Sequence, residues 1–231
     1  MLRSGRLRHG PDHRRQRRDV HLIVKTSPSP RRLGTETSKT RAVLLDAAEK
    51  LMLEDGYPAV TSRQVAARAG LKPQLVHYYF RTMDDLFLAL FRDRAAQGFS
   101  RQARAMSSEQ PLWALWELNR DPRGTALTME FVALANHRKA IRSEISVFAE
   151  RYRAEQLALL RAAFARHQLD EAVFPPMVVT VLMTSLTRML VIEGETLGMS
   201  GGHAETVAFV EQFLERLEGP RQAAVGDVAS L

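Results

Sequence analysis

The sequence predicts an all-α protein of about nine helices. Between residues 38 and 218, apolar residues recur three and four positions apart, which is the spacing of one face of a helix. No segment shows the alternation of apolar and polar residues that a half-buried strand requires. Glycine and proline separate the periodic segments, for example at Gly56, Gly70, Pro111 and Pro175-Pro176. At 231 residues, the chain is long enough to bury a proper core.

The stretch from Thr61 to Phe80 predicts two short helices joined by a tight turn. Thr61 and Gln64 fit a capping box. In this motif the Thr61 hydroxyl accepts the backbone N–H of Gln64, and the Gln64 side chain accepts the backbone N–H of Thr61. Gly70 can adopt the left-handed conformation that ends the first helix, and Pro73 fits the first turn of the second. This geometry lets the second helix enter the major groove of DNA. We interpret the stretch as a helix-turn-helix, with a generic helical hairpin as the alternative.

Longer helices are expected on both sides of this motif. The segment from Ser38 to Asp55 has an apolar face that can cover the two short helices, which cannot bury enough surface by themselves. Thr82 is expected to cap a helix that has acidic residues in its first turn and extends to about Arg104. The predicted order is therefore helix, helix-turn-helix, long helix.

This N-terminal half carries the residues of a known family. They are Gly56-Tyr57, Thr61, Val65-Ala66, Ala69-Gly70, Tyr78-Tyr79-Phe80 and Asp84-Asp85-Leu86. In this spacing they resemble the N-terminal signature of the TetR family of bacterial transcriptional repressors. The resemblance implies an N-terminal DNA-binding domain, followed by a helical domain that binds a small molecule and forms the dimer.

Five more helices are expected in the rest of the chain. Their segments are 111–119, 125–135, 140–167, 177–192 and 203–218. The segment 177–192 is apolar on almost every side, so we expect a second subunit to cover part of it, with a central position in a monomeric core as the alternative. The resemblance implies that the eighth and ninth helices form a four-helix bundle with those of a second copy.

The formal net charge of +7 is concentrated near the start of the chain. Residues 1–35 contribute +8, residues 36–82 contribute +2 and residues 83–231 contribute −3. We expect residues 1–35 to be a disordered basic extension, which is either an arm that contacts DNA or dispensable. Four parts are predicted: this extension, a DNA-binding domain (36–82), a ligand-binding and dimerisation domain (83–218) and a flexible tail (219–231).

The candidate DNA contacts lie mainly in the predicted helix-turn-helix. Gln74 can pair with adenine, and Lys72 with guanine or a phosphate. The resemblance implies contacts from Arg63, His77 and Tyr78, while Tyr79 is equally suited to contact and to packing. The full set is Lys39, Thr61, Ser62, Arg63, Lys72, Pro73, Gln74, Leu75, His77, Tyr78 and Tyr79.

Three residues depart from the family pattern. Lys72 stands where the family often has a serine or threonine cap, and Leu75 where a small or hydroxyl residue is common. Met83 replaces a lysine that often contacts a phosphate. Leu75 is a candidate for apolar contact with a thymine methyl group. Loss of one phosphate contact would lower the salt slope of binding by about 0.9.

The ligand site is implied by the resemblance to lie among helices four to eight. Candidate lining residues are Trp113, Trp116, Met129, Phe131, Phe148, Tyr152, Met183, Thr184 and Thr187, with Asn136, His137 and Arg188 as polar anchors. Core packing is the alternative role for each apolar member. Arg188 is the one charged residue in the segment 177–192. It could form a salt bridge across the dimer, anchor an anionic ligand or lie exposed.

Other classes of function lack their residues. The chain has no cysteine, no histidine pattern for a metal, no glycine-rich phosphate loop and no Gly-x-Ser-x-Gly motif. We expect no metal, no cofactor and no catalysis. No apolar run reaches the ~18 residues of a membrane span, so a cytoplasmic protein is expected.

The predicted function is a DNA-binding regulator. We expect a repressor that binds double-stranded operator DNA as a homodimer and is released by a small, largely hydrophobic ligand. The alternatives are an activator or a regulator that responds to no ligand. A helical enzyme or a purely structural dimer fits the sequence less well, since neither explains the stretch from Thr61 to Phe80.

Overall fold

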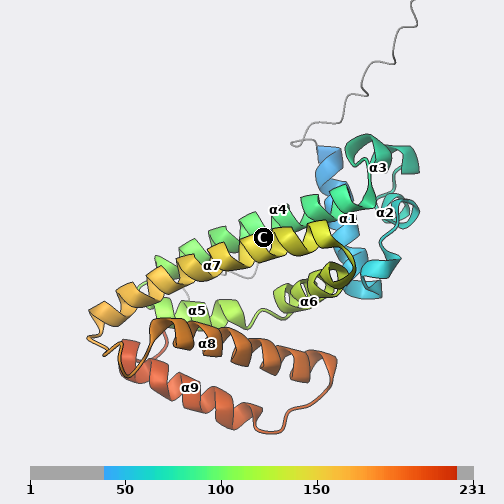
Figure 1. Cartoon of the computed structure of the whole chain (residues 1–231). Helices are drawn as coiled ribbons and strands as arrows, with labels where there is room; N and C mark the ends of the chain where they lie inside the picture. The colour runs from blue at the N-terminus through green and yellow to red at the C-terminus, as the bar shows by residue number, and fades with distance from the viewer. Residues whose placement is uncertain (1–38, 223–231) are drawn as a thin grey trace, which may run out of the picture. The chain divides into compact units, whose positions relative to one another are not determined.

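The computed structural model describes residues 39–222, and all its regular elements in that range are helices (Figure 1). The predicted extension at residues 1–35 and the end of the predicted tail lie outside the described residues. In chain order the elements are α1 (Lys39–Asp55), η1 (Tyr57–Ala59), α2 (Ser62–Arg68), α3 (Pro73–Tyr79), α4 (Met83–Met106), α5 (Pro111–Asn119), α6 (Pro122–His137), α7 (Lys139–Arg166), α8 (Pro176–Val191), η2 (Ile192–Thr196) and α9 (His203–Glu218). The all-α prediction is confirmed.

Helix ends follow the predicted signals, with two differences. Gly56 and Gly70 both have positive φ angles, of 79° and 66°, as the turns after α1 and α2 require. The helix expected from Thr125 begins earlier, at Pro122, because proline needs no amide hydrogen in the first turn. The eighth helix continues past Val191 as a turn of π-helix, η2.

One of the two expected N-terminal caps is complete. At Thr82, the hydroxyl accepts the Asp85 amide and the Asp85 carboxylate accepts the Thr82 amide, each at 3.0 Å. At Thr61, the hydroxyl accepts the Gln64 amide at 3.3 Å. The predicted return bond from the Gln64 side chain is wrong, because the Thr61 amide donates to the carbonyl of Ala59 at 2.9 Å.

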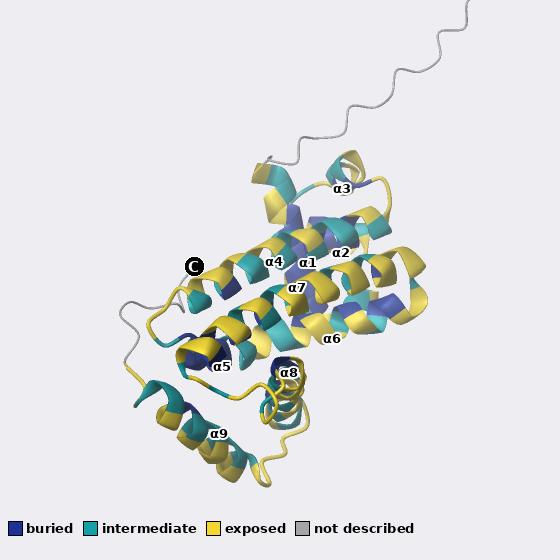
Figure 2. Ribbon diagram, turned by 60° about the vertical axis from the view of Figure 1, so that its left-hand side comes forward, coloured by how far each residue is buried: buried dark blue, intermediate teal, exposed yellow. Residues whose placement is uncertain are grey.

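The buried residues, which are dark blue in Figure 2, include two apolar clusters. The first joins α1, α2 and α3 to the first half of α4, to α6 and to the start of α7. The second joins α5, the end of α7 and α9, with partly buried residues of α8 packed against it. The predicted domain boundary after residue 82 falls inside the first cluster, and the described residues 39–222 group as one compact unit.

The described residues after α9 are fixed to α5. The buried carboxylate of Glu218 accepts the backbone amides of Leu112 and Trp113 at 3.0 and 3.1 Å. The Trp113 indole donates to the carbonyl of Gly219 at 3.1 Å, and Gln110 donates to the carbonyl of Pro220 at 3.0 Å. The part of the predicted tail that the structure describes is therefore anchored at the N-terminus of α5.

Candidate nucleic-acid interface and ligand region

The position of α3 is fixed by two buried side chains, one within the helix and one directly after its end. Val76 and Phe80 are 1% and 3% exposed and belong to the first apolar cluster. Gln74, His77 and Tyr78 lie on the opposite side of the helix and are exposed. They are three and four positions apart, so they share one face. One face of α3 is thus polar and exposed to solvent, while the opposite face packs on the first apolar cluster.

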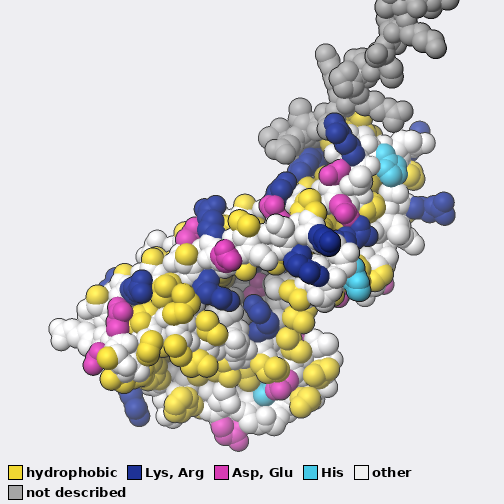
Figure 3. Space-filling model, viewed as in Figure 1, with side chains coloured by type: hydrophobic (Ala, Val, Ile, Leu, Met, Phe, Trp, Pro, Cys, Tyr) yellow, Lys and Arg dark blue, Asp and Glu magenta, His cyan; other side chains and the backbone are white. Residues whose placement is uncertain are grey.

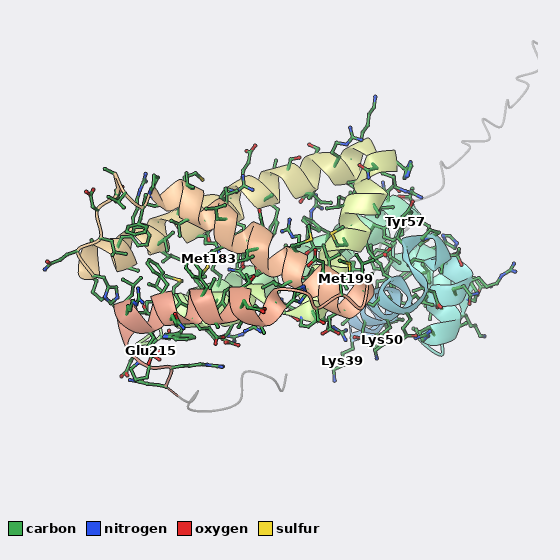
Figure 4. The ribbon with its side chains drawn as sticks, turned by 90° about the horizontal axis from the view of Figure 1, so that it is seen from below. Lys39, Lys50, Tyr57, Met183, Met199 and Glu215 are labelled. Carbon is green, nitrogen blue, oxygen red and sulfur yellow. The ribbon has the colours of Figure 1, made fainter. Side chains whose placement is uncertain are left out.

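The other predicted contact residues surround this face. Lys39, Thr61, Arg63, Lys72 and Pro73 are exposed. Ser62 and Leu75 are half-buried, and the Tyr79 ring packs both on the apolar cluster and edge-on against Tyr78, with centroids 5.0 Å apart. All the predicted DNA contacts therefore lie on or beside α2, α3 and the first turn of α1. Lys39 is labelled at the start of α1 in Figure 4.

Two arginines modify the charge of this surface, and sequence analysis did not single them out. The guanidinium of Arg41 lies 5.4 Å from the centre of the Phe80 ring, next to the end of α3. The Arg68 guanidinium donates to Glu54 at 2.6 Å, so its charge is offset by α1. The sequence does contain a signal for Arg41. A cation in the first turn of a helix is unfavourable with the helix dipole unless an anion lies nearby, so Arg41 could have been singled out as a residue that binds a phosphate.

Four polar contacts connect α1, η1, α4, α6 and the residue between α6 and α7. The buried carboxylate of Glu49 pairs with Arg94 of α4 and accepts from Arg123 of α6 at 2.7 and 3.1 Å. The Glu130 carboxylate accepts the Tyr57 amide at 2.7 Å, and Figure 4 labels Tyr57 beside α6. Arg138 binds Asp84 in the first turn of α4. Sequence periodicity does not reveal such pairs, since their members are between 45 and 74 residues apart.

Three of the predicted ligand residues come together in one aromatic cluster. This cluster consists of Phe91 and Phe99 of α4, Phe131 of α6, and Phe148 and Tyr152 of α7, with adjacent ring centroids 5.0 to 5.7 Å apart. Burial raises the pKa of the Tyr152 hydroxyl, an effect that the nearby Arg101 opposes. The cluster forms an apolar wall where α4 and α7 pack.

The remaining predicted ligand residues are dispersed. Trp113 and Trp116 are buried in the second apolar cluster, and the Trp116 indole donates to Glu211 of α9 at 3.2 Å. Met183 packs on that cluster and lies between α8 and α9 in Figure 4, while Thr184 and Thr187 donate to backbone carbonyls of α8. Met129, Asn136, His137 and Arg188 are exposed. No ion pair involves Arg188 within residues 39–222. Glu193 of η2, an acidic residue that follows Arg188 in the chain, is bonded to His203 at 2.8 Å.

The outer side of α8 carries exposed apolar side chains. Figure 3 shows apolar atoms gathered over α8 and α9, and the exposed members are Met177, Val178, Val181, Leu182 and Met189 of α8, with Phe209 of α9. By length and composition, the helix Pro176–Thr196 could cross a membrane, with a mean hydropathy of 1.5. One such helix is weak evidence for a membrane protein, because an interface between subunits has the same composition.

Comparison with known proteins identifies the N-terminal helices. Residues 44–90, which run from α1 through α3 into α4, match the family of bacterial regulatory proteins called the tetR family. These N-terminal helices are those of the TetR family. The match and the related regulators make the chain a transcriptional regulator and imply DNA binding and dimer formation. We call residues 39–82 the head and residues 83–222 the effector region.

Relatives and solved structures of the family match most of the chain. The transcriptional regulator BetI of Escherichia coli O157:H7 is 26% identical over 194 residues, which span 79% of this chain and 97% of BetI. A TetR-family regulator from Rhodococcus sp. has a TM-score of 0.61 at 18% identity, over 78% of this chain and all of the other. A regulator from Saccharomonospora viridis, solved with choline, has a TM-score of 0.60 at 20% identity, over 76% and 93% of the two chains.

Proposed function

We propose that this regulator is a cytoplasmic repressor that binds its operator as a homodimer and dissociates when a small, largely hydrophobic ligand binds. The observation that carries the proposal is the exposed polar face of α3 on a buried apolar support. A helix presented in this way can read base edges in the major groove.

In this proposal, α3 reads bases and its surroundings bind phosphates. Gln74 is exposed in the first turn of α3 and pairs with adenine, and Leu75 contacts a thymine methyl. Lys39, Arg63 and Lys72 supply positive charge at the edges, and Arg41 joins them beside Phe80. Thr61, Ser62, Pro73, His77, Tyr78 and Tyr79 complete the contact surface.

Two copies would join through α8 and α9. The exposed apolar face of α8 has no cover within residues 39–222, and the match to the TetR family implies dimer formation. Two heads then face half-sites one helical turn apart, roughly 34–36 Å, or a multiple of this distance. The variant Leu182→Glu places a charge on the most exposed leucine of α8 and should give monomers in analytical ultracentrifugation. Val147→Glu, a matched change at an exposed valine of α7, should leave the dimer intact.

A ligand would act through the contacts between the effector region and the head. Induction requires a ligand with different affinities for the DNA-competent and incompetent conformations. The aromatic cluster offers an apolar surface for such a ligand, and the related S. viridis protein was solved with choline. From there, the bonds of α6 to Glu49 and to the Tyr57 amide transmit a movement of α6 to the head.

A gel-shift titration with DNA flanking the protein's own gene tests the proposal. We expect a saturable complex whose affinity falls steeply with salt and survives excess unrelated DNA. Equal affinity for unrelated DNA at every salt concentration would contradict sequence-specific regulation. The variant Arg188→Ala tests whether this residue forms a salt bridge across the dimer or anchors a ligand. If dimerisation and ligand response both persist, Arg188 is an exposed residue with neither role.

A further inference from the structure

The inner face of α9 carries two glutamates that bind α5, and Glu218 makes the closer contact. Its side chain is 2% exposed, and its carboxylate accepts the backbone amides of Leu112 and Trp113 at 3.0 and 3.1 Å. Amides in the first turn of a helix have no partner inside that helix, and the positive end of the helix dipole lies there. The buried charge of Glu218 is therefore compensated by α5 itself.

Glu211 makes the second contact, two helical turns earlier in α9. Its carboxylate accepts the indole N–H of Trp116 at 3.2 Å and lies 3.4 Å from the guanidinium of Arg120, towards the other end of α5. The two glutamates are seven positions apart, which is about 10.5 Å along the helix axis. Two attachments at this separation set both the position and the direction of α9 against α5, the helix that it contacts most closely.

The opposite face of α9 carries an exposed aromatic ring, Phe209, which is 74% exposed. Phe209 is nine positions before Glu218, so at about 100° per residue it lies about 180° around the helix. The two residues are also about 13.5 Å apart along the axis, which excludes direct contact. The attachment of the inner face to α5 thus determines the direction in which Phe209 points.

We propose that Glu218 positions α9 for dimerisation: by binding the first turn of α5, it holds Phe209 in the orientation in which this ring packs on the second copy. Glu218 is buried within its own subunit and touches no residue of the second copy. Without this attachment α9 would have to be ordered on association, and that entropic cost weakens the dimer. The inference rests on the proposed dimer through α8 and α9, to which it adds the residue that preorganises the interface.

A purely structural role for Glu218 predicts a different result. In that case, loss of the carboxylate lowers the thermal stability of the subunit but leaves the contribution of Phe209 to dimerisation unchanged. The effects of distant, independent sites multiply in a dissociation constant, whereas the effects of coupled sites do not. A double-mutant cycle between Glu218 and Phe209 therefore separates the two roles.

The cycle is measured on the full-length protein as the dimer dissociation constant, by fluorescence-detected sedimentation. Phe209→Ala should raise this constant about tenfold, because it removes an aromatic anchor from the interface. Glu218→Ala should raise it by a similar factor, although residue 218 is buried within the subunit. In the Glu218→Ala background, Phe209→Ala should then change the constant by less than about threefold, because Phe209 is no longer held towards the second copy.

Two further variants form a matched pair. Glu218→Gln keeps an acceptor for the α5 amides but loses the charge, so its effect should lie between wild type and Glu218→Ala. Glu215→Gln makes the same change one turn earlier in α9, where Figure 4 labels Glu215, and should leave the constant unchanged because this side chain is exposed. Circular dichroism checks that each variant is folded, and the cycle is run with Glu218→Gln if Glu218→Ala is not.

Two results would overturn the proposal: a dissociation constant that neither Glu218 variant changes, or effects of Glu218 and Phe209 that multiply independently in the double variant. In both cases a weaker dimer in Phe209→Ala alone leaves the proposed dimer interface standing. An unchanged dissociation constant for Phe209→Ala in the wild-type background would instead reject α9 as part of that interface, and this inference with it.

Discussion

The head and the effector region place their polar groups differently. In the head, the buried side chains are apolar except for Glu49, which is paired with two arginines. In the effector region, Arg101 Nε, both amide atoms of Gln102 and Asn119 Nδ2 are buried without hydrogen bonds or ion pairs. Unpaired polar groups of the head therefore lie at its surface, whereas several unpaired polar groups of the effector region are buried.

This difference corresponds to two kinds of recognition. DNA is a large external partner, so the residues that contact it need a rigid apolar support beneath them. A small ligand that binds within the helical region would instead contact side chains that face inward. Each unpaired buried group costs about 1–3 kcal/mol of folding free energy. The following predictions proceed from the largest expected effect to the smallest.

Trp116 tests whether the effector region has a true core as well as a ligand site. The indole is fully buried against the second apolar cluster and donates to Glu211. Trp116→Ala should cost about 3–5 kcal/mol of unfolding free energy in urea denaturation. Trp116→Phe keeps most of the packing and should cost clearly less. A cost below about 1 kcal/mol for the alanine variant would instead indicate that Trp116 borders an internal space.

The head was largely predictable from the sequence because its signals are local. Thr82 with Asp85, Gly70 and Pro73 each specify a helix end through their own backbone or their nearest neighbours. The α3 face follows from the same spacing, since Val76 and Phe80 fix which side is buried. Local chemistry and tertiary packing agree there.

The effector region was predictable as helices but not as a site. Tryptophan spacing on α5 indicates an apolar face, yet only the fold decides that Trp116 meets Glu211 of α9. Gln102 has no sequence signal beyond being a polar residue of α4, and its burial follows from the helices that pack around α4. Both depend on contacts between distant segments.

Glu49 tests the one charged group inside the head. Its side chain is 5% exposed and pairs with Arg94 and Arg123. Glu49→Ala should cost about 2–3 kcal/mol, because charge-assisted hydrogen bonds between α1, α4 and α6 are lost. The control is Asp46→Ala, which breaks an exposed pair with Lys50 and should cost at most about 0.5 kcal/mol. Equal costs in chemical denaturation would show that burial does not strengthen the Glu49 pairs.

Gln74 tests whether the exposed face of α3 reads DNA without supporting the fold. Gln74→Ala should weaken operator binding by about 1–3 kcal/mol and leave Tm unchanged, because the side chain is exposed and, in the proposed function, pairs only with a base. Fluorescence anisotropy with operator and with base-substituted operator measures this. Gln64→Ala, on α2, is the matched control and should change affinity little. A uniform loss on every DNA sequence would assign Gln74 to the phosphates instead.

The pH dependence of the contact between α4 and α7 gives the smallest effect. Arg92 donates two hydrogen bonds to Glu144, at 2.7 and 3.0 Å, and these bonds hold the pKa of the Glu144 carboxyl below its usual 4.5 despite partial burial. The unfolded chain therefore binds this proton more readily than the folded one. The resulting stabilisation is present above pH 4.5 and is lost as pH falls through the lowered pKa.

Because the pair is largely exposed, Glu144→Gln should cost no more than about 0.5 kcal/mol at neutral pH. The difference from wild type should shrink in denaturation curves as the pH falls below 4.5 and through the lowered pKa of Glu144. Glu150→Gln, an exposed change on the same helix, should show no such pH-dependent difference, since no ion pair involves Glu150 within residues 39–222. A Glu144→Gln cost that stays constant down to acid pH would mean that packing, and not the charge on Glu144, joins α7 to α4 at this point.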